Sequence, residues 1–181
     1  MCDSIIYLIG FSGTGKTTIG KELSRILDIP FIDMDSKIEE IANDSITSIF
    51  KNLGEEKFRN METNLLNSIS LLGDANCRYS QVVSTGGGVW SIVKNREMMS
   101  RSGIVICLEA APETILDRLE YQKNDEGSGA DRPMLNSDDP LQAINELLEI
   151  RRADYLKADF VIDTDGKHVL NIASEIVGLL E

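Results

Sequence analysis

Basic residues are scarce in this sequence: 18 Lys and Arg stand against 30 Asp and Glu, and the formal net charge is −12. Binding to nucleic acid depends on clustered Lys and Arg, because the release of counterions from phosphates supplies much of the affinity. No such cluster is visible, so we expect no nucleic-acid partner. If the ligands are anions, the overall field repels them, and binding must depend on locally placed arginines and backbone N–H groups.

Cysteine is also scarce, and the spacing of the three residues, Cys2, Cys77 and Cys107, contains no C-x-x-C pattern. The odd number and wide separation argue against a disulfide framework and against a zinc site. Ile5 to Ile9 form an apolar run with no basic segment before it, and Gly10 ends the run far short of a secretory signal or membrane span. We therefore expect a cytoplasmic protein with no membrane association.

What the sequence does contain is a regular alternation of short apolar runs with longer stretches of helical period, in a chain of 181 residues. This pattern is typical of repeated βα units around a parallel sheet, and the length suits one domain, residues 1–181. The expected strands are Ile5 to Ile9, Phe31 to Asp33, Gln81 to Ser84, Ile104 to Leu108 and Phe160 to Ile162. The expected helices are Lys16 to Leu27, Lys37 to Ala42, Glu55 to Leu72, Glu113 to Tyr121, Leu141 to Ala158 and Val169 to Leu180.

The segment from Gly10 to Thr17 fits the phosphate-loop pattern G-x-x-x-x-G-K-[ST], and it lies between an expected strand and an expected helix. Its glycines allow backbone N–H groups to turn toward phosphate oxygens, and the helix adds the positive end of its dipole. Lys16 can reach the β- and γ-phosphates of ATP, and the Thr17 hydroxyl can coordinate one Mg²⁺ ion. The ATP-binding residues predicted here are Gly13, Thr14, Gly15, Lys16, Thr17 and Thr18.

A dinucleotide site does not fit the same segment, because the third glycine of G-x-G-x-x-G is absent after Gly13 and Gly15. A phosphate loop alone leaves three uses of the nucleotide open: transfer to a metabolite, hydrolysis as a switch, or mechanical work. Other motifs must decide between them.

Asp33-Met34-Asp35 follows the second expected strand, where a parallel sheet exposes its carboxyl ends beside the phosphate loop. One carboxylate could hold Mg²⁺ through water and the other a substrate hydroxyl. The two side chains project the same way if the strand continues, and toward different partners if the chain turns after Asp33. The plainer alternative is that Asp35 is a helix N-cap and Asp33 is solvated.

Thr85-Gly86-Gly87-Gly88 follows the third expected strand, again at a carboxyl end. Three successive glycines are costly unless the backbone must approach something closely, so a ligand and a plain turn are the two interpretations. Four arginines are candidates for binding an anion: Arg59, Arg132, Arg151 and Arg152. Each of them alone is more often a solvated surface charge.

Taken together, these motifs make the sequence resemble the shikimate kinases over nearly its full length. The motifs are the phosphate loop, Asp33-Met34-Asp35, Gly54-Glu55-Glu56-Lys57-Phe58-Arg59, Thr85-Gly86-Gly87-Gly88, Arg132-Pro133-Met134-Leu135, and Arg151 with Tyr155. The resemblance implies an α/β, three-layer P-loop kinase fold like that of nucleoside monophosphate kinases, with a five-stranded parallel sheet. It also implies a substrate-binding helical region at about 34–61, a mobile lid at about 120–135, and a protein that we expect to be a monomer.

The activity that the resemblance implies is transfer of the γ-phosphoryl group of ATP to the 3-hydroxyl of shikimate, giving ADP and 3-phosphoshikimate for aromatic amino acid biosynthesis. On the acceptor side, Asp35 would bind shikimate hydroxyls and act as the base, and Arg59 and Arg151 would clamp the carboxylate. Within Gly86, Gly87 and Gly88, the backbone of Gly87 would contact the ring hydroxyls. Arg152 directly follows Arg151, which leaves open which of the two faces the substrate.

On the donor side, the resemblance assigns Mg²⁺ to Thr17 and Asp33, and makes Lys16, Asp35 and Arg132 the catalytic residues. Arg132 would move in from the lid, with Gly127 and Gly129 as hinges. Arg118 would pack against adenine, and Lys167 would lie in the adenine loop. The rivals are another small-metabolite kinase, such as one resembling gluconate kinase, and a noncatalytic nucleotide-binding protein.

Overall fold

The computed structural model describes residues 4–71, 78–125 and 137–181. The expected catalytic Arg132, the expected hinges Gly127 and Gly129, and most of the expected lid lie outside the described residues. The same holds for Cys2 and Cys77, whereas Cys107 is buried in a strand. Within the described ranges, no helix is both long enough and apolar enough to cross a bilayer.

The centre of the molecule is a five-stranded parallel sheet with the order β2-β3-β1-β4-β5. All five expected strands are present, with ends that shift by no more than a few residues. Their bounds are β1 (Ser4–Gly10), β2 (Phe31–Asp33), β3 (Tyr79–Ser84), β4 (Gly103–Glu109) and β5 (Phe160–Asp163). Because β1 pairs with both β3 and β4, the chain reverses its direction of winding beside β1, which is where open α/β sheets bind ligands.

Seven α-helices and one short 3-10 helix are found among the described residues. They are α1 (Lys16–Leu27), α2 (Met34–Ala42), α3 (Ile46–Ser70), η1 (Val89–Ser91), α4 (Val93–Ser102), α5 (Pro112–Asp125), α6 (Pro140–Tyr155) and α7 (Val169–Leu180). The six expected helices are confirmed, and Asp139 caps α6 ahead of Pro140. The prediction missed α4, η1 and the first half of α3.

These misses have physical reasons. In α4 only Asn95 and Met99 are buried, so the helix has no apolar stripe that the sequence would reveal. In α3, Gly54 adopts φ 81°, and the helix continues past it with a kink, although a glycine normally marks a helix end. Packing against the rest of the protein therefore determines both elements more than local propensity does.

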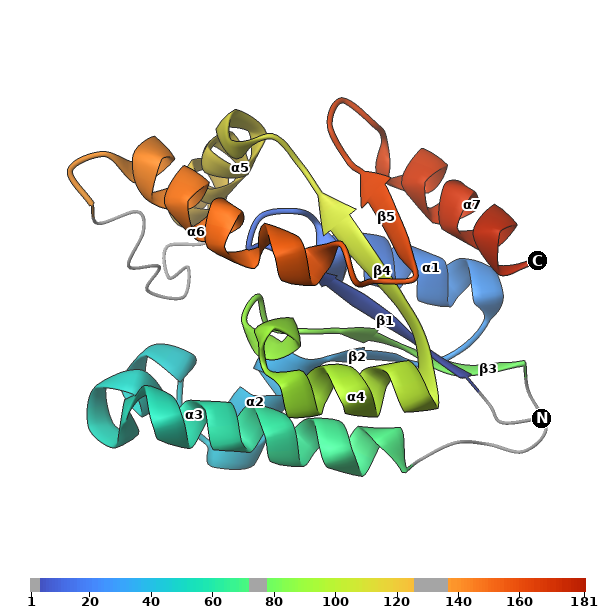
Figure 1. Ribbon diagram of the computed structural model, residues 1–181, viewed down its shortest axis with the longest axis horizontal. Coiled ribbons are helices and arrows are strands. Elements are labelled where there is room, and N and C mark those ends of the chain that lie inside the picture. The colour runs from blue at the N-terminus through green and yellow to red at the C-terminus, as the bar shows by residue number, and fades with distance from the viewer. Residues whose placement is uncertain (1–3, 72–77, 126–136) are drawn as a thin grey trace.

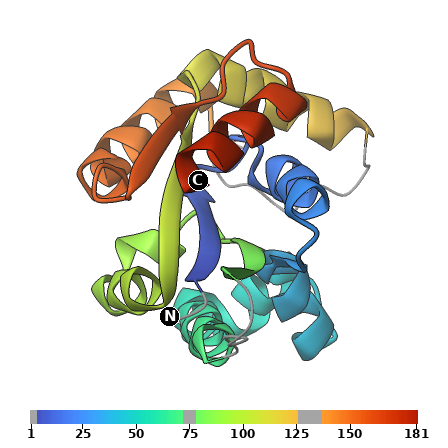
Figure 2. The ribbon, with the colours of Figure 1, turned by 90° about the vertical axis from the view of Figure 1, so that its right-hand side faces the viewer.

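The helices cover both faces of the sheet, which makes the three expected layers (Figures 1 and 2). Residues from β1, β3 and β4 pack on one face with Leu66 of α3, Met99 of α4 and Trp90. On the other face the sheet packs against Ile19 of α1 and Ile176 of α7. Figure 1 shows α3 and α4 side by side below the sheet, and α5 and α6 beyond the carboxyl end of β4.

A smaller apolar cluster joins α2 to α3 through Ile38, Ile49 and Phe58. This cluster fixes the two helices that carry Asp35 and Arg59. The helical region expected at about 34–61 is therefore a packed unit at the edge of the sheet, next to the carboxyl end of β2.

Candidate active site

The phosphate loop connects β1 to α1 and has the backbone that its glycines predict. Gly13 has φ 86° and Gly15, the N-cap of α1, has φ 92°, a region that residues with a Cβ atom rarely adopt. The Thr14 hydroxyl donates to the Phe11 carbonyl at 2.8 Å, which closes the turn. The helix therefore begins with backbone N–H groups available to an anion.

Lys16 is buried, with 8% of its surface exposed, and its ammonium lies inside the loop. Nζ donates to the carbonyl oxygens of Gly10, at 3.0 Å, and Phe11, at 2.8 Å. Burial lowers the pKa of Lys16 to about 8, although the nearby carboxylates of Asp35 and Asp33 raise it. These two hydrogen bonds fix the ammonium group inside the loop, and it is still mainly charged at neutral pH.

The Thr17 hydroxyl donates to Asp33 Oδ2 at 2.7 Å, so the two predicted metal-binding residues are in direct contact. Asp33 also caps α2, because its Oδ1 accepts from the Ser36 N–H at 3.1 Å. The alternative interpretation, in which Asp35 is the N-cap and Asp33 is solvated, is wrong. The helix begins directly after Asp33, and Asp35 lies in its first turn. The two carboxylates therefore have different surroundings.

A cavity of about 450 Å³ runs from the phosphate loop to these carboxylates. Lys16, Thr17, Asp33 and Asp35 all line it, as does Thr85 at the end of β3. The pKa of Asp35 is raised to about 6, first by burial and then by the neighbouring charge of Asp33, against the opposing effect of Lys16. Asp35 is therefore a carboxylate whose proton affinity suits proton transfer near neutral pH.

Glu62 lies close to Asp35 beside Gly86, and the sequence motifs did not identify it. Only 1% of its surface is exposed, and burial raises the pKa of Glu62 to about 7 despite the charge of Arg59. Its Oε2 accepts from Arg59 Nη1 at 2.8 Å, whereas its buried Oε1 has no hydrogen-bond partner among the described residues. One signal was available in the sequence: Glu62 follows Arg59 by three residues, the spacing of neighbours on one helix face.

Arg59 lies between two carboxylates of α3. Besides its bond to Glu62, it donates through Nη2 to Glu55 Oε1 at 3.1 Å. The exposed fraction is 27% for the Arg59 side chain and 67% for that of Glu55, so only the bond to Glu62 is shielded from water. The guanidinium is held by the buried carboxylate and remains partly open to a ligand.

The glycine triplet that follows β3 lies close to the side chains of Asp35, Arg59 and Glu62. A Cβ atom on Gly86 would lie 2.6 Å from Glu62 Oε1 and 2.8 Å from Asp35 Oδ1, and one on Gly88 would lie 2.7 Å from Arg59 Nη1. The expected close approach is therefore real, but it is made to the protein's own polar side chains. In the described part of the chain, the N–H groups of Gly86, Gly87 and Gly88 donate to no protein acceptor.

Arg151 and Tyr155, one turn apart on α6, both bind the Gly87 carbonyl. Arg151 Nη1 donates to it at 3.0 Å and the Tyr155 hydroxyl at 3.1 Å. The Arg151 guanidinium also lies 5.4 Å from the centre of the Phe11 ring, which connects it to the phosphate loop. Arg151 is thereby placed between the glycine loop and the nucleotide loop.

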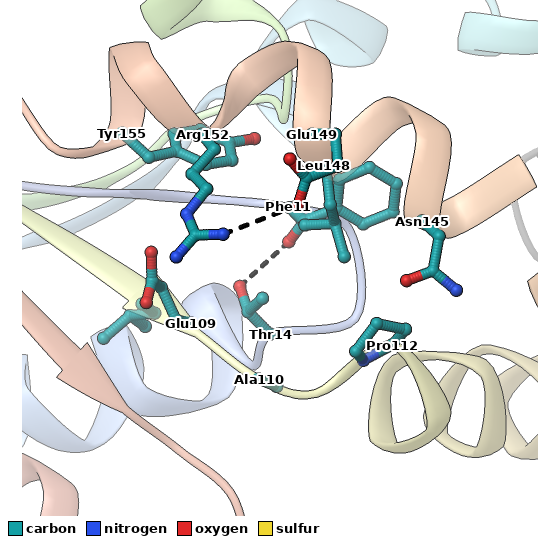
Figure 3. Close-up of a pocket in the computed structure, with 11 residues that line it drawn as sticks. Phe11, Thr14, Glu109, Ala110, Pro112, Asn145, Leu148, Glu149, Arg152 and Tyr155 are labelled. Atoms are coloured by element: carbon teal, nitrogen blue, oxygen red, sulfur yellow. Dashed lines mark hydrogen bonds and ion pairs between the residues drawn. The ribbon is translucent and has the colours of Figure 1, made fainter.

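Arg152 points into a different cavity, of about 220 Å³, which lies between the phosphate loop, the end of β4 and α6 (Figure 3). There its Nη1 lies 3.5 Å from Glu149 Oε1, and both side chains are largely exposed. Of the two adjacent arginines, only Arg151 contacts the glycine loop.

The expected adenine residues line a third cavity, of about 480 Å³, which also borders the phosphate loop. Arg118 donates to the Gly13 carbonyl at 3.2 Å and through Nη2 to the Thr164 carbonyl at 3.0 Å. Lys167 forms an ion pair with Glu175 at 2.9 Å. Arg118, Lys167 and Thr18 therefore line one cavity beside the phosphate loop.

Comparison with known proteins agrees with this geometry. The profile of the shikimate kinase family matches residues 12–181. The shikimate kinase of Geobacter sulfurreducens is 41% identical over 171 residues, which cover 94% of this chain and 87% of that protein. The shikimate kinase of Thermodesulfovibrio yellowstonii is 37% identical over 172 residues, which cover 95% of this chain and 92% of that protein.

Solved structures give the same result. The shikimate kinase of Acinetobacter baumannii in complex with shikimate superposes with a TM-score of 0.85 at 35% identity, over 98% of this chain and 93% of that chain. A gluconokinase from Sinorhizobium meliloti has a TM-score of 0.59 at 15% identity, over 98% of this chain and 91% of that chain, which shows a shared fold alone. The expected P-loop kinase fold is confirmed, and the chain belongs to the shikimate kinase family.

Proposed function

We propose that the protein transfers the γ-phosphoryl group of ATP to the 3-hydroxyl of shikimate, and releases ADP and 3-phosphoshikimate. The observation that carries the proposal is the arrangement around Gly86–Gly88, where Asp35, Arg59 and Arg151 approach one loop from three helices. A buried carboxylate suits a hydroxyl acceptor, and two planar guanidinium groups suit a carboxylate. The acceptor half is therefore suited to a molecule that carries both groups.

On the donor side, the phosphate loop binds the triphosphate through backbone N–H groups and Lys16. The nearby opening with Arg118 and Lys167 takes the adenosine. Arg132 would approach the transferring phosphoryl group from the segment between α5 and α6. In this proposal, residues 1–181 form one domain that acts as a monomer, with a lid at about 120–135 that keeps water away from the transfer.

The donor atoms near the phosphate loop fit a magnesium ion. Thr17 Oγ1 and Asp33 Oδ2, 2.7 Å apart, are hard oxygen donors beside the expected phosphates, and Mg²⁺ prefers such ligands together with phosphate and water. Thr17 would bind it directly and Asp33 would support it. When bound, the ion neutralises charge on the phosphate oxygens.

The mechanism needs a proton acceptor and no covalent intermediate on the protein. Asp35, with a pKa near 6, is ionised at neutral pH and can take the proton of the shikimate 3-hydroxyl as its oxygen bonds to the γ-phosphorus. Arg59 and Arg151 fix the ring by its carboxylate, and Lys16 stabilises charge that moves toward the leaving ADP oxygen. The lysine and Asp35 influence each other's pKa, so the two halves of the site meet there.

A panel of acceptors tests the proposal. Purified protein with ATP and Mg²⁺ should release ADP when shikimate is the acceptor. It should not do so with gluconate or with the 3-deoxy analogue of shikimate, which lacks the 3-hydroxyl. Nucleotide hydrolysis without an acceptor should be slow by comparison. ADP release with gluconate and not with shikimate would support the rival metabolite kinase, and nucleotide binding without any acceptor-dependent turnover would support the noncatalytic alternative.

A further inference from the structure

The carbonyl oxygens of the segment from Gly87 to Trp90 accept hydrogen bonds from two helices. Arg151 and Tyr155 of α6 donate to the Gly87 carbonyl. From α4, Asn95 Nδ2 donates to the Val89 carbonyl at 3.2 Å, and Arg96 Nη1 donates to the Trp90 carbonyl at 3.1 Å. Two helices that are distant in sequence thus hold one irregular loop between them.

An ion pair joins the same two helices directly. Arg96 Nη1 lies 2.8 Å from Asp154 Oδ1, and the exposed fractions of the two side chains are only 15% and 24%. Trp90, which is buried, reinforces the pair, because its Nε1 donates to the Asp154 backbone carbonyl at 2.6 Å. We call Arg96, Asp154 and Trp90 the α4–α6 latch.

The position of the latch connects it to the acceptor. Asp154 follows Arg151 by three residues and directly precedes Tyr155, so the latch fixes the helical turn that carries both donors to Gly87. Arg96 donates a hydrogen bond to the Trp90 carbonyl, at the other end of the same loop. The distance between the Arg151 guanidinium and the backbone of Gly86–Gly88 is therefore set by contacts on both sides of the loop.

We propose that Arg96 and Asp154 are positioning residues for the acceptor: through the α4–α6 latch they hold Arg151 and the Gly86–Gly88 backbone at the spacing that shikimate requires. This inference rests on the proposed function and extends it to residues that do not touch the substrate. Neither Arg96 nor Asp154 lines the cavity at the phosphate loop or the cavity with Arg118 and Lys167. The latch should accordingly affect one substrate and not the other.

The test is a comparison of the two Michaelis constants in Arg96→Ala and Asp154→Asn. The KM for shikimate should rise about tenfold, which corresponds to about 1.4 kcal/mol and is the size expected for one lost charged hydrogen bond. The KM for ATP should change by less than twofold. Arg96→Lys keeps a charge that can reach Asp154 and should recover part of the loss.

Two matched controls are available on the same elements. Lys157→Ala removes the other partner of Asp154, an ammonium 2.8 Å from Oδ1 whose side chain is 55% exposed. Arg101→Ala removes an arginine of α4 that pairs with Glu97 at 3.8 Å and is 81% exposed. Both variants should leave the KM for shikimate unchanged, because neither residue contacts the loop.

A double-mutant cycle completes the experiment, with shikimate affinity measured by calorimetry. Arg96→Ala in the Asp154→Asn background should weaken binding far less than it does in the wild type, because the pair is already broken. Equal rises in both KM values, or a lower melting temperature with an unchanged shikimate KM, would overturn the latch while leaving the proposed function intact. Wild-type protein without shikimate-dependent turnover would overturn both.

Discussion

The donor half and the acceptor half of this site are built in different ways. The proposed donor half is one continuous segment, Gly10 to Thr17, in which the single lysine lies against the carbonyl oxygens of the loop itself. The acceptor half brings together Asp35, Glu62, the glycine triplet and Arg151, which come from four separate parts of the chain. A local motif can therefore specify the first half, whereas only the fold can assemble the second.

The two halves also differ in their electrostatics. The donor half places one buried cation among backbone dipoles, and burial lowers the pKa of Lys16. The acceptor half places two carboxyl groups beside one glycine, and burial raises the pKa of both Asp35 and Glu62. Substitutions in one half should consequently change the handling of one substrate, and the predictions below test that separation from the largest effect to the smallest.

The largest effect is expected for Asp35→Asn, which keeps the shape of the side chain and removes its ability to accept a proton. The kcat should fall by about 10²- to 10⁴-fold, the usual range for loss of a general base. In the wild type, kcat/KM for shikimate should decline as the pH falls below about 6, because the protonated form of Asp35 accumulates there. A kcat within a fewfold of the wild type would remove Asp35 from the chemistry.

A smaller effect is expected for Arg59→Ala, which should raise the KM for shikimate about 10- to 100-fold through loss of a charged, partly buried carboxylate contact. The KM for ATP should stay within about twofold. Glu55→Gln serves as the control, since it removes only the exposed partner of Arg59. If both substrates were affected equally, Arg59 would not belong to the acceptor half.

Sequence motifs predicted most residues of the candidate site, in both halves, and missed a few. The phosphate loop, the strand ends and Arg59 carry signals that are local or belong to an ordered set of motifs; the structure contains the expected strand and helix around the loop and places Arg59 beside Gly88. Arg96 carries no such signal, and the only one for Glu62 is its i,i+3 spacing from Arg59, because a lone charged residue on a helix is usually solvated. Only the packing of α3 and α4 near the glycine loop gives these two residues partners that are largely shielded from water.

Glu62→Gln should change the pH dependence of stability. The pKa of Glu62 is about 7 in the folded protein, above its usual value of 4.5, so the folded state holds an extra proton between those values. The resulting stabilisation is present below about pH 4.5 and is lost as the pH rises through about 7. Between pH 4.5 and 7.5 the wild type should lose on the order of 1–3 kcal/mol relative to the variant. Denaturant unfolding at both pH values measures this, and parallel pH curves would contradict it.

The smallest effect is expected for Arg152→Ala. Arg152 faces Glu149 in the cavity of Figure 3, and its side chain is 69% exposed. Both KM values and kcat should therefore stay within about twofold of the wild type, because exposed ion pairs contribute little. Arg151→Ala is the matched comparison and should weaken shikimate binding. A reversal of this order would exchange the roles of the two arginines.

The most direct test of the separation between the halves is a binding matrix measured by calorimetry. Shikimate and the Mg²⁺ complex of a non-hydrolysable ATP analogue are titrated separately into the wild type, Lys16→Met and Arg59→Ala. The account predicts that Lys16→Met loses nucleotide binding and retains shikimate binding, and that Arg59→Ala shows the opposite pattern. Loss of both ligands in either variant, or no shikimate binding to the wild type, would contradict it.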